Sequence, residues 1–339
     1  MIIIQTNSDD WSTHEVMQWI YHLSPNIKIQ RINDRFQPSL LTYLHQSSDD
    51  FYFALDNYYV NSNTPFVFWY RRGIVNFSKI QLQSDSDTHR PIRTMQEQIR
   101  LNSFRESSKF AVLFDSIVRS KSKLCINSPS NFSTNKLDNL ALARQVGLNV
   151  PATIVTNDAV RLKQFCTGFE FIIIKDIEFN PLHVIGKNNN LVFQPTVVMS
   201  NTELSKFIGN RTDFNGLIFC QKYIEKVFEI RVYFLMDKYY AMAIFSQNNT
   251  QTKLDYRNYD LDNPNRLVPF KLPKALEGKI KKMMKILKLE SGSIDLIYSR
   301  DKKYFFLEVN PIGQFQWLSK HCNYYLEKQI ASTLLKPLI

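Results

Sequence analysis

The sequence has no apolar run near the roughly 20 residues that a membrane-spanning helix needs, and its first residues lack the basic region of a secretion signal. Cysteine is scarce, and Cys125, Cys166, Cys220 and Cys322 form no CxxC pair. We therefore expect a soluble, cytoplasmic protein with reduced cysteines and no membrane partner. The scattered cysteines also argue against a zinc knuckle or a redox motif.

Several common catalytic signatures are missing as well. The sequence contains no GxxxxGK[ST] loop, no GxGxxG after a strand, no kinase HRD or DFG, no GxSxG and no HExxH. The six histidines show no metal-ligand spacing. These absences exclude the familiar phosphate-binding loops and the common hydrolase nucleophiles.

Basic residues outnumber acidic ones by 42 to 31, which gives the chain a net charge of +11. Nucleotide phosphates, an acidic peptide or a solvated surface could each accommodate this excess. Nucleic acid is not the expected partner, because the lysines and arginines are spread along the chain and no RRM, KH or C2H2 signature is present.

The chain is long enough for two or three lobes, and its 44% apolar content can supply their cores. Residues 1–122 alternate short strands and helices, which predicts an α/β lobe. Residues 123–222 predict a small central α+β lobe with a largely antiparallel sheet. Residues 223–339 predict a C-terminal lobe of hairpins and helices with a second antiparallel sheet.

Helix signals are clearest at the ends of the expected helices. Thr13 is expected to cap a helix that ends at Leu23, and Asp158 to cap another. Residues 94–119 contain few helix breakers, which predicts one long helix.

Strand signals predict further elements. The segment LVFQPTVV, residues 191–198, has the composition of a single strand. The segment FEIRVYFLMDKYYAMAIF is expected to form a hairpin that turns at Asp237 and Lys238. Residues 293–310 predict another hairpin.

The geometry of that last hairpin is informative. If it turns about Asp301 and Lys302, Asp295 lies directly opposite Glu308. The opposite, apolar face would carry Ile294, Leu296, Leu307 and Val309.

Two like charges directly across a strand pair are unfavourable unless something compensates them. A divalent cation would do so, and Asn310 adds a third oxygen donor on the face of Glu308. We therefore predict that Asp295, Glu308 and Asn310 hold Mg²⁺ beside a nucleotide. A solvated or lysine-paired hairpin face is the alternative.

Two lysines stand where a cation is costly without an anion. Lys175 ends the apolar strand FEFIIIK, and Lys136 lies in the loop or first turn before the helix ALARQVG, where the helix dipole disfavours a cation. A phosphate would compensate either charge, although each lysine could simply be solvated.

The apolar strand GLIFCQKYI is followed by a short polar connection. Such a connection can present backbone N–H and C=O groups to an adenine edge, with Glu229 able to reach ribose hydroxyls and Arg231 phosphate oxygens. Because Glu229 and Arg231 share one strand face, a structural ion pair between them is the alternative.

The order of these residues resembles the ATP-grasp superfamily. The resemblance rests on Lys136, Lys175, Gln221-Lys222-Tyr223-Ile224, Glu229-Ile230-Arg231, Asp295 and Leu307-Glu308-Val309-Asn310-Pro311. The closing NPIGQFQWL, the segment Asp255-Tyr256-Arg257 and the segment Trp69-Tyr70-Arg71-Arg72 narrow it to graspetide synthetases, the microviridin-type peptide ligases. Within these, the chain is most similar to maturases of grasp-with-spasm systems, over nearly its whole length.

The resemblance implies the ATP-grasp fold, with a pre-ATP-grasp-like first lobe and ATP between the two lobes that follow. Lys136 and Lys175 would contact ATP phosphates. The adenine hinge would be formed by Gln221, Lys222, Tyr223 and Ile224.

The same resemblance assigns the ribose to Glu229 and the γ-phosphate to Arg231. One or two Mg²⁺ ions would be held by Asp295, Glu308 and Asn310. Arg257, with Asp255 beside it, would lie where such enzymes stabilise the acceptor carboxylate or its acyl-phosphate. The catalytic residues would be Lys175, Arg231 and Arg257.

The hypothesis for the reaction follows from these roles. An Asp or Glu side chain of a ribosomal precursor peptide would attack the γ-phosphate of ATP to give an acyl-phosphate. A Ser or Thr hydroxyl, or a Lys amine, would then displace phosphate and close a macrocyclic ester or amide.

The peptide leader could bind the strand LVFQPTVV and the helix after it. Arg71 and Arg72 could meet the acidic core of the peptide, or could close a strand as a solvated pair. A ligase for a small metabolite or free amino acid is one alternative function, and a non-catalytic, nucleotide-gated peptide-binding module is another. A homodimer through the basic first lobes is also open.

Overall fold

The computed structural model describes most of the chain in two compact units. The described residues are 1–33, 41–46, 51–55, 58–61, 63–73, 90–131, 134–177, 184–185, 191–192, 196–254, 256 and 260–339. Unit 1 comprises Met1–Ser133, Leu287–Ser291 and Gln314–Ile339, and unit 2 comprises Thr134–Ile286 and Gly292–Gly313. The segment from Gln314 onward thus belongs with the N-terminal part, whereas the sequence placed all of residues 223–339 in one lobe. No helix in the described ranges is long and apolar enough to cross a membrane.

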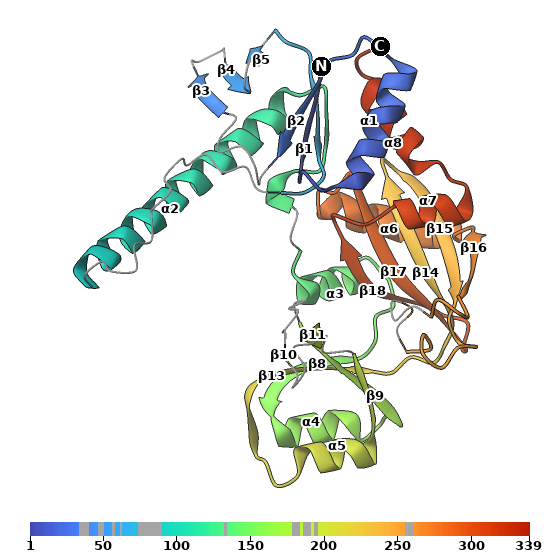
Figure 1. Ribbon diagram of the computed structural model, residues 1–339. Helices are drawn as coiled ribbons and strands as arrows, with labels where there is room; N and C mark the ends of the chain where they lie inside the picture. Colours follow the sequence, from blue (N-terminus) through green and yellow to red (C-terminus); the bar gives the residue numbers. More distant parts are fainter. Residues whose placement is uncertain are drawn as a thin grey trace. The chain divides into compact units, whose positions relative to one another are not determined.

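Unit 1 is built on a parallel sheet in the order β2-β1-β6-β7 (Figure 1). Its strands are β1 (Ile2–Thr6), β2 (Ile29–Asn33), β6 (Val67–Tyr70) and β7 (Leu124–Ile126). Every residue of β1 is buried, as expected for a parallel strand covered on both faces. The predicted α/β character of this part is confirmed. A separate three-stranded sheet contains β3 (Leu41–Gln46), β4 (Phe51–Leu55) and β5 (Tyr58–Asn61).

The helices of unit 1 differ in detail from those expected. They are α1 (Trp11–Leu23), α2 (Arg90–Lys121), α7 (Gln316–Cys322) and α8 (Leu326–Leu335), with a short 3₁₀ turn at Pro129–Asn131. Asp10 caps α1 by accepting from the Ser12 N–H, so the prediction of Thr13 as the cap is wrong. Thr13 instead lies inside the helix and donates its hydroxyl to Asp10 at 3.0 Å. α1 packs against α8, so the two ends of the chain share one core.

Unit 2 begins with an antiparallel sheet in the order β12-β9-β13-β8. Its strands are β8 (Thr153–Asp158), β9 (Phe171–Lys175), β12 (Val197–Ser200) and β13 (Asp213–Lys222). Two helices, α4 (Ala159–Cys166) and α5 (Asn201–Ile208), cover one face of it (Figure 1). Asp158 caps α4 by accepting from the Arg161 N–H at 2.9 Å, which confirms the predicted cap.

The segment expected to be one strand, residues 191–198, is divided. Leu191–Val192 forms β11 and pairs with β10 (Val184–Ile185), whereas Val197 begins β12 in the larger sheet. Residues 193–195, between the two strands, lie outside the described residues. The single-strand prediction is therefore wrong.

A second sheet of unit 2 has the order β16-β15-β14-β17-β18. Its strands are β14 (Lys226–Leu235), β15 (Lys238–Phe245), β16 (Arg266–Phe270), β17 (Ser291–Ser299) and β18 (Tyr304–Asn310). The helices of this part are α3 (Lys136–Gln145) and α6 (Lys274–Ile286). α6 buries Leu276, Ile280, Met283 and Met284. The turn between β14 and β15 is at Met236 and Asp237, both with positive φ, one residue earlier than expected.

Candidate active site

The two acids of the expected metal site face each other across the β17–β18 hairpin. Asp295 is the Cα partner of Glu308, and Ser293 is the partner of Asn310 two residues away. Side chains two apart on a strand share a face, so these four side chains lie on one side of the hairpin. The predicted pairing of Asp295 with Glu308 is confirmed.

A β-bulge at Leu307 produces this register. Between the turn and the bulge, the strands pair one residue away from the expected register, so that Leu296 faces Phe306. The extra residue in the bulge restores the expected register beyond it, and Asp295 faces Glu308. Phe306 is 1% exposed, whereas Leu307 is only half-buried. The placement of Leu307 on the apolar face is therefore wrong, and Phe306 takes that position.

Arg231, on β14, forms a close ion pair with Asp295. Its Nη1 donates to Oδ1 at 2.8 Å and to Oδ2 at 2.7 Å, and each side chain is 12% exposed. Burial by itself would lower the pKa of Arg231, but the attraction of Asp295, then of Tyr256 and Glu308, raises it. The guanidinium is therefore a fixed positive charge directly beside the predicted metal ligand.

Lys136 supplies a second cation next to Glu308. It is the first residue of α3, which Asn135 caps through its side-chain oxygen. The Lys136 Nζ lies 4.0 Å from Glu308 Oε2 and donates to the backbone oxygen of Asp176 at 3.4 Å. The side chain of Lys136 thus reaches from the start of α3 to Glu308 on β18 and to Asp176, the residue after β9. The helix dipole alone would disfavour a cation at this position. Each of the two expected acids therefore has one expected phosphate-binding cation beside it: Arg231 beside Asp295, and Lys136 beside Glu308.

The donors expected to hold Mg²⁺ fit a hard cation in their chemistry. Two carboxylates and an amide oxygen are ligands that Mg²⁺ prefers. Asn310 is exposed, and its Oδ1 accepts from the Ile312 N–H at 2.9 Å, which orients the amide at the end of β18. Across the described ranges there is no group of three or more His, Cys, Asp or Glu placed to hold a metal. Asp295, Glu308 and Asn310 stay the predicted ligands.

Lys175 and the expected adenine hinge lie on paired strands. Lys175, at the end of β9, is the cross-strand partner of Phe219 on β13, and its Nζ lies over that ring at 5.4 Å. Gln221 is buried, and its Nε2 donates to Thr153 Oγ1 at 2.9 Å, so its side chain holds the sheet together.

The residues after Gln221 lead out of the sheet. The Lys222 N–H donates to Ala152 O at 2.9 Å, and the Tyr223 N–H to Phe171 O at 3.2 Å. The Tyr223 ring meets Phe171 edge-on, with centroids 6.3 Å apart. Burial, followed by nearby carboxylates, raises the pKa of Tyr223. Ile224 is buried, whereas Tyr223 is partly exposed.

Glu229 is buried and takes other partners than expected. Its Oε1 accepts from Lys226 Nζ at 2.6 Å and its Oε2 from Ser246 Oγ at 2.6 Å. The alternative of a Glu229–Arg231 ion pair is therefore wrong, because Arg231 pairs with Asp295. The exposed carboxylate of the same connection is Glu225, which lies 3.4 Å from Arg300.

No sequence pattern pointed to Lys226. Residues three apart on a regular strand point to opposite faces, but the registered pairing of β14 with β15 begins only at Glu229. Lys226 lies before that point and can therefore reach the carboxylate of Glu229.

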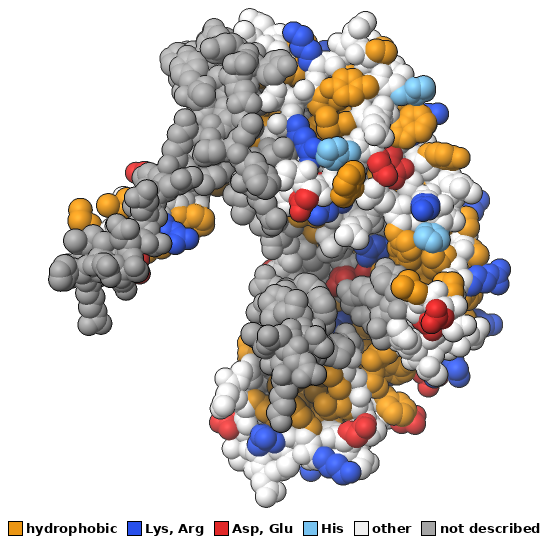
Figure 2. All heavy atoms as spheres, viewed as in Figure 1, with side chains coloured by type: hydrophobic (Ala, Val, Ile, Leu, Met, Phe, Trp, Pro, Cys, Tyr) orange, Lys and Arg blue, Asp and Glu red, His pale blue; other side chains and the backbone are white. Residues whose placement is uncertain are grey.

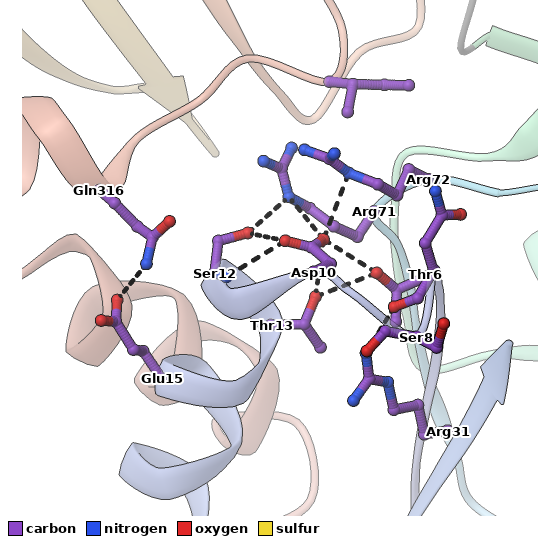
Figure 3. A network of polar contacts seen from close by, with 12 residues as sticks. Thr6, Ser8, Asp10, Ser12, Thr13, Glu15, Arg31, Arg71, Arg72 and Gln316 are labelled. Carbon is purple, nitrogen blue, oxygen red and sulfur yellow. Dashed lines mark hydrogen bonds and ion pairs between the residues drawn. The ribbon is translucent and has the colours of Figure 1, made fainter.

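Arg71 and Arg72 lie in unit 1, where β6 ends (Figure 3). Arg71 is only 5% exposed; its Nε donates to Ser12 Oγ at 3.1 Å and lies 3.5 Å from Asp10 Oδ2. Arg72 Nε lies 3.3 Å from the same oxygen, and its side chain is 29% exposed. The alternative of a solvated arginine pair is therefore wrong for Arg71.

Burial would raise the pKa of Asp10, but Arg71, Ser12 and Arg72 outweigh this effect, and the pKa lies below its ordinary value. Asp10 also accepts from the Thr6 hydroxyl at 2.9 Å. A charged Asp10 therefore holds both arginines. Asp255 and Arg257, the other expected substrate contacts, lie outside the described residues.

Comparison with known proteins gives a consistent result at the level of solved structures. No family model and no curated protein sequence matches the chain. A RiPP-associated ATP-grasp ligase of Chryseobacterium gregarium, in complex with ADP and a leader and core peptide, has a TM-score of 0.76 and 21% identity over 99% of this chain and 96% of that one. The macrocyclase MdnC of Microcystis aeruginosa MRC, bound with precursor peptide MdnA, has a TM-score of 0.73 and 25% identity over 99% of each chain.

The ATP-grasp ligase PsnB, complexed with a minimal precursor, Mg and ADP, has a TM-score of 0.73 and 17% identity over 100% of this chain and 97% of that one. All three likenesses span nearly the full length of both chains, so they include both units. They confirm the fold expected from the sequence, and the chain has the fold of these ATP-grasp ligases.

Proposed function

We propose that the protein is an Mg-ATP-dependent peptide ligase. It activates Asp or Glu side chains of a ribosomal precursor peptide as acyl-phosphates and joins them to Ser or Thr hydroxyls, or to Lys amines, as macrocyclic esters or amides. One observation carries the proposal: Asp295 faces Glu308, and Arg231 and Lys136 each accompany one of these acids.

Two acids with a basic residue beside each suit a ligand that consists of an anion and a bound divalent cation, such as Mg-ATP. Mg²⁺, when bound, neutralises charge on the phosphates, and Asp295, Glu308 and Asn310 would hold it. Arg231 and Lys136 would then face phosphate oxygens instead of carboxylates, with Lys175 as a third cation. When Mg-ATP replaces the pairs between these side chains, each buried charge would still have a partner of opposite sign, which limits the cost of desolvation.

The nucleotide base would lie against Gln221 to Ile224, between the two sheets of unit 2. The partly exposed ring of Tyr223 gives this connection an apolar surface for an adenine ring. Glu229 was the expected ribose ligand, but both of its oxygens are already hydrogen-bonded. We therefore propose that Glu225 contacts the ribose.

The reaction has two steps. A peptide carboxylate oxygen bonds to the γ-phosphorus, the bond from that phosphorus to the β,γ-bridging oxygen breaks, and ADP leaves. A hydroxyl oxygen then attacks the acyl carbon, its proton is lost to solvent, and phosphate leaves with the electrons of the acyl–oxygen bond. Arg231 and Lys136 stabilise negative charge in the first step, and exclusion of water would protect the acyl-phosphate until the second.

The proposed partner is a precursor peptide with a leader and an acidic, Thr-rich core. The solved structures support a peptide partner, because the Chryseobacterium ligase holds a leader and core peptide and MdnC holds its precursor. Of the two arginines expected to contact the peptide in unit 1, Arg72 has the greater accessible surface to meet a carboxylate, while both approach Asp10. Figure 2 shows basic side chains dispersed among acidic and polar ones on the visible face, which suits local contacts better than a nucleic-acid band.

The direct test is incubation with ATP, Mg²⁺ and a Thr/Ser- and Asp/Glu-rich peptide, to be sought in the reading frames beside the gene. We expect the peptide to lose the mass of one water for each bond formed, with ADP released in the same number. Release of AMP and pyrophosphate, or an unchanged peptide mass, would contradict the proposal. Mild alkali should reopen esters and leave amides intact.

Two alternatives give other results in the same assay. A ligase for a small metabolite or free amino acid would release ADP with that compound and leave the peptide unchanged. A nucleotide-gated peptide-binding module would bind the peptide in the presence of ATP without consuming it. Neither has a specific observation in its favour.

A further inference from the structure

Two neighbouring strands of the parallel sheet in unit 1 end in charged loops. β1 ends at Thr6 and β6 at Tyr70, and the two strands run parallel side by side. The sheet order β2-β1-β6-β7 places the strand after β1 on one side of it and β6 on the other. In open α/β sheets, ligands bind outside the carboxyl ends of strands at such a reversal. Asp10 follows β1 at this end, and Arg71 and Arg72 follow β6.

Four donors of the chain hold the Asp10 carboxylate in one place. Its Oδ1 accepts from the N–H of Ser12 at 3.1 Å and from the hydroxyl of the same residue. Its Oδ2 accepts from the hydroxyls of Thr6 and Thr13 at 2.9 and 3.0 Å. Thr6 lies on β1, and Ser12 and Thr13 lie on α1. A carboxylate offers about four lone pairs, so these contacts fix Asp10 to both elements without any arginine.

Both arginines approach Asp10 with the inner nitrogen of the guanidinium. Arg71 Nε lies 3.5 Å and Arg72 Nε 3.3 Å from Asp10 Oδ2. Figure 3 shows the terminal nitrogens of both side chains pointing away from Asp10. The outer edge of a guanidinium, which carries parallel N–H donors, is the edge that binds a carboxylate in a bidentate manner. Asp10 therefore directs these guanidinium groups without occupying their outer edges.

Arg72 is the one of the two that a ligand can reach. Its side chain is 29% exposed, against 5% for Arg71. Within the described part of the chain, the ion pair with Asp10 is the only polar contact that the Arg72 side chain makes. The Arg71 guanidinium lies over the ring of Phe315, 5.2 Å from its centroid, and both side chains are buried. Arg71 is thus part of the packing, whereas Arg72 presents its outer edge to solvent.

A buried acceptor at the same end of the sheet has no donor among the described residues. Gln5 is 2% exposed, and its Oε1 accepts no hydrogen bond from them. It lies beside the arginines, because its backbone oxygen accepts from the N–H groups of Arg71 and Arg72 at 2.8 and 3.3 Å. Buried acceptors without a donor are rare and mark places that a ligand or water completes. A peptide, which brings its own N–H groups, suits this position.

We propose that Asp10 is a positioning residue of a carboxylate site at this end of the sheet, where the outer edge of Arg72 contacts an acidic side chain of the peptide. The inference rests on the proposed function and adds the residue that directs Arg72. A free arginine side chain loses rotamer freedom when it binds a ligand. Because Asp10 is itself fixed by four donors, it holds Arg72 before the peptide arrives, and this preorganisation strengthens binding.

Charge and position predict opposite results for the same substitution. Asp10 and a peptide carboxylate are both negative, so by its charge alone Asp10 would repel the ligand, and its loss would tighten binding. If Asp10 directs Arg72, its loss weakens binding instead. Asp10→Asn removes the charge and keeps a residue that caps helices well. Asp10→Glu keeps the charge and moves it by one methylene, and it leaves the buried Arg71 with a carboxylate if Asp10→Asn does not fold.

The matched control is the same arrangement on the surface of unit 2. Asp158 caps α4, and Arg161 Nε lies 3.5 Å from its Oδ2, but the two side chains are 41% and 76% exposed. Asp158→Asn therefore removes an aspartate of the same kind from beside an arginine, outside the proposed site. Arg72→Gln measures the contact itself.

The experiment measures binding of a fluorescein-labelled, Thr/Ser- and Asp/Glu-rich peptide in the absence of ATP, by fluorescence anisotropy. A second peptide carries Asn and Gln in place of Asp and Glu. We expect Arg72→Gln, Asp10→Asn and Asp10→Glu each to weaken binding of the acidic peptide about tenfold, as for loss of one charged hydrogen bond. Binding of the second peptide should stay the same in all variants, and Asp158→Asn should bind both peptides like wild type.

Tighter binding of the acidic peptide by Asp10→Asn, or unchanged binding by Asp10→Glu, overturns the positioning role. Equal weakening of both peptides also overturns it, because it shows a general structural defect. Equal affinity of wild type for the two peptides removes the carboxylate site itself. Because no ATP is present, these results stand whether or not the peptide is ligated, and a failure of the proposed function shows only in the ligation assay.

Discussion

Arg231 donates from a single guanidinium nitrogen to both carboxylate oxygens of Asp295, at 2.8 and 2.7 Å. The residue proposed to face the γ-phosphate thus contacts a residue proposed to hold the cation of the same nucleotide. The attraction of Asp295 raises the pKa of Arg231, so the guanidinium stays charged beside this carboxylate. Binding of Mg-ATP would replace this ion pair by one between Arg231 and the γ-phosphate and one between Asp295 and Mg²⁺. A substitution of either residue is therefore expected to affect the other.

Replacement of Glu308 by Gln should remove activity while the fold remains. Gln keeps the size of the side chain but loses the charge that attracts Lys136 and, in the proposal, Mg²⁺. We expect peptide-dependent ADP release to fall by about 100-fold or more, as for loss of one electrostatic contact in a transition state. Asp301→Asn, in the turn of the same hairpin and largely exposed, is the control and should retain nearly full activity. Equal loss in both variants would contradict the assignment of Glu308.

Gly313 should tolerate no side chain. A Cβ at this position would overlap Ser293, including its backbone nitrogen, so rotation of the Ser293 side chain cannot relieve the clash. Because Ser293 pairs with Asn310, the damage would fall on the end of β18 that carries the proposed metal ligand. We expect Gly313→Ala to lower the free energy of unfolding by about 1–3 kcal/mol or more, as overpacking does, and to abolish activity.

The control for this substitution is a glycine without neighbours. Gly278 is exposed in α6, and a Cβ there would meet nothing within 4 Å. Because Ala has the higher helix propensity, Gly278→Ala should raise the free energy of unfolding by about 0.5–1 kcal/mol. Chemical denaturation measures the free energy of unfolding of both variants. If Gly313→Ala raised it, position 313 would have room for a Cβ beside Ser293, and the prediction would be refuted.

How far the sequence could predict this site depends on which interaction decides each position. The facing of Asp295 and Glu308 follows from hairpin pairing and was predictable, although the bulge at Leu307 was not. A bulge is a local departure from period-2 alternation, so a pattern of apolar and polar residues assigns the wrong face beyond it. That is why Leu307 was placed where Phe306 lies.

Other residues depend on tertiary contacts that no local pattern contains. Arg71 and Arg72 follow an apolar strand, which is compatible with solvation, yet both approach Asp10, some 60 positions earlier in the chain. The predicted cap at Thr13 failed for the same reason, because Asp10 is a stronger cap acceptor and is already held there by its arginines. The α/β character of the first residues and the antiparallel sheets of unit 2, in contrast, were predicted from the order of strand and helix signals.

Asp10 should make stability depend on pH. Its pKa in the folded protein lies below its ordinary value of about 3.9, so its contribution is fully present above that value. It is lost as the pH falls through the lower, folded pKa. We expect the melting temperature of wild type to drop more steeply below about pH 4 than that of Asp10→Asn.

The same variant should be less stable at neutral pH. Asp10→Asn removes the carboxylate that the buried Arg71 approaches, and breaking a buried pair costs about 3–5 kcal/mol. Thermal unfolding across a pH series measures both effects. Parallel curves for the two proteins would show that Asp10 is not the titrating group.

The cysteines should resist thiol reagents. Burial raises the pKa of Cys125 to about 12 and that of Cys322 to about 11, so little thiolate exists at neutral pH. We expect slow labelling of the native protein by a disulfide reagent and rapid labelling in denaturant. Rapid reaction of Cys125 or Cys322 without denaturant would show that these thiols are accessible.

The measurement that tests the central claim most directly is calorimetric titration with ADP at several Mg²⁺ concentrations. Wild type should bind ADP more tightly as Mg²⁺ increases, because Asp295, Glu308 and Asn310 are proposed to hold the ion beside the nucleotide. Glu308→Gln should lose most of this Mg²⁺ dependence, and Asp301→Asn should keep it. If wild-type affinity does not change with Mg²⁺, or changes equally in Glu308→Gln, the three oxygen donors do not form the cation site of this protein.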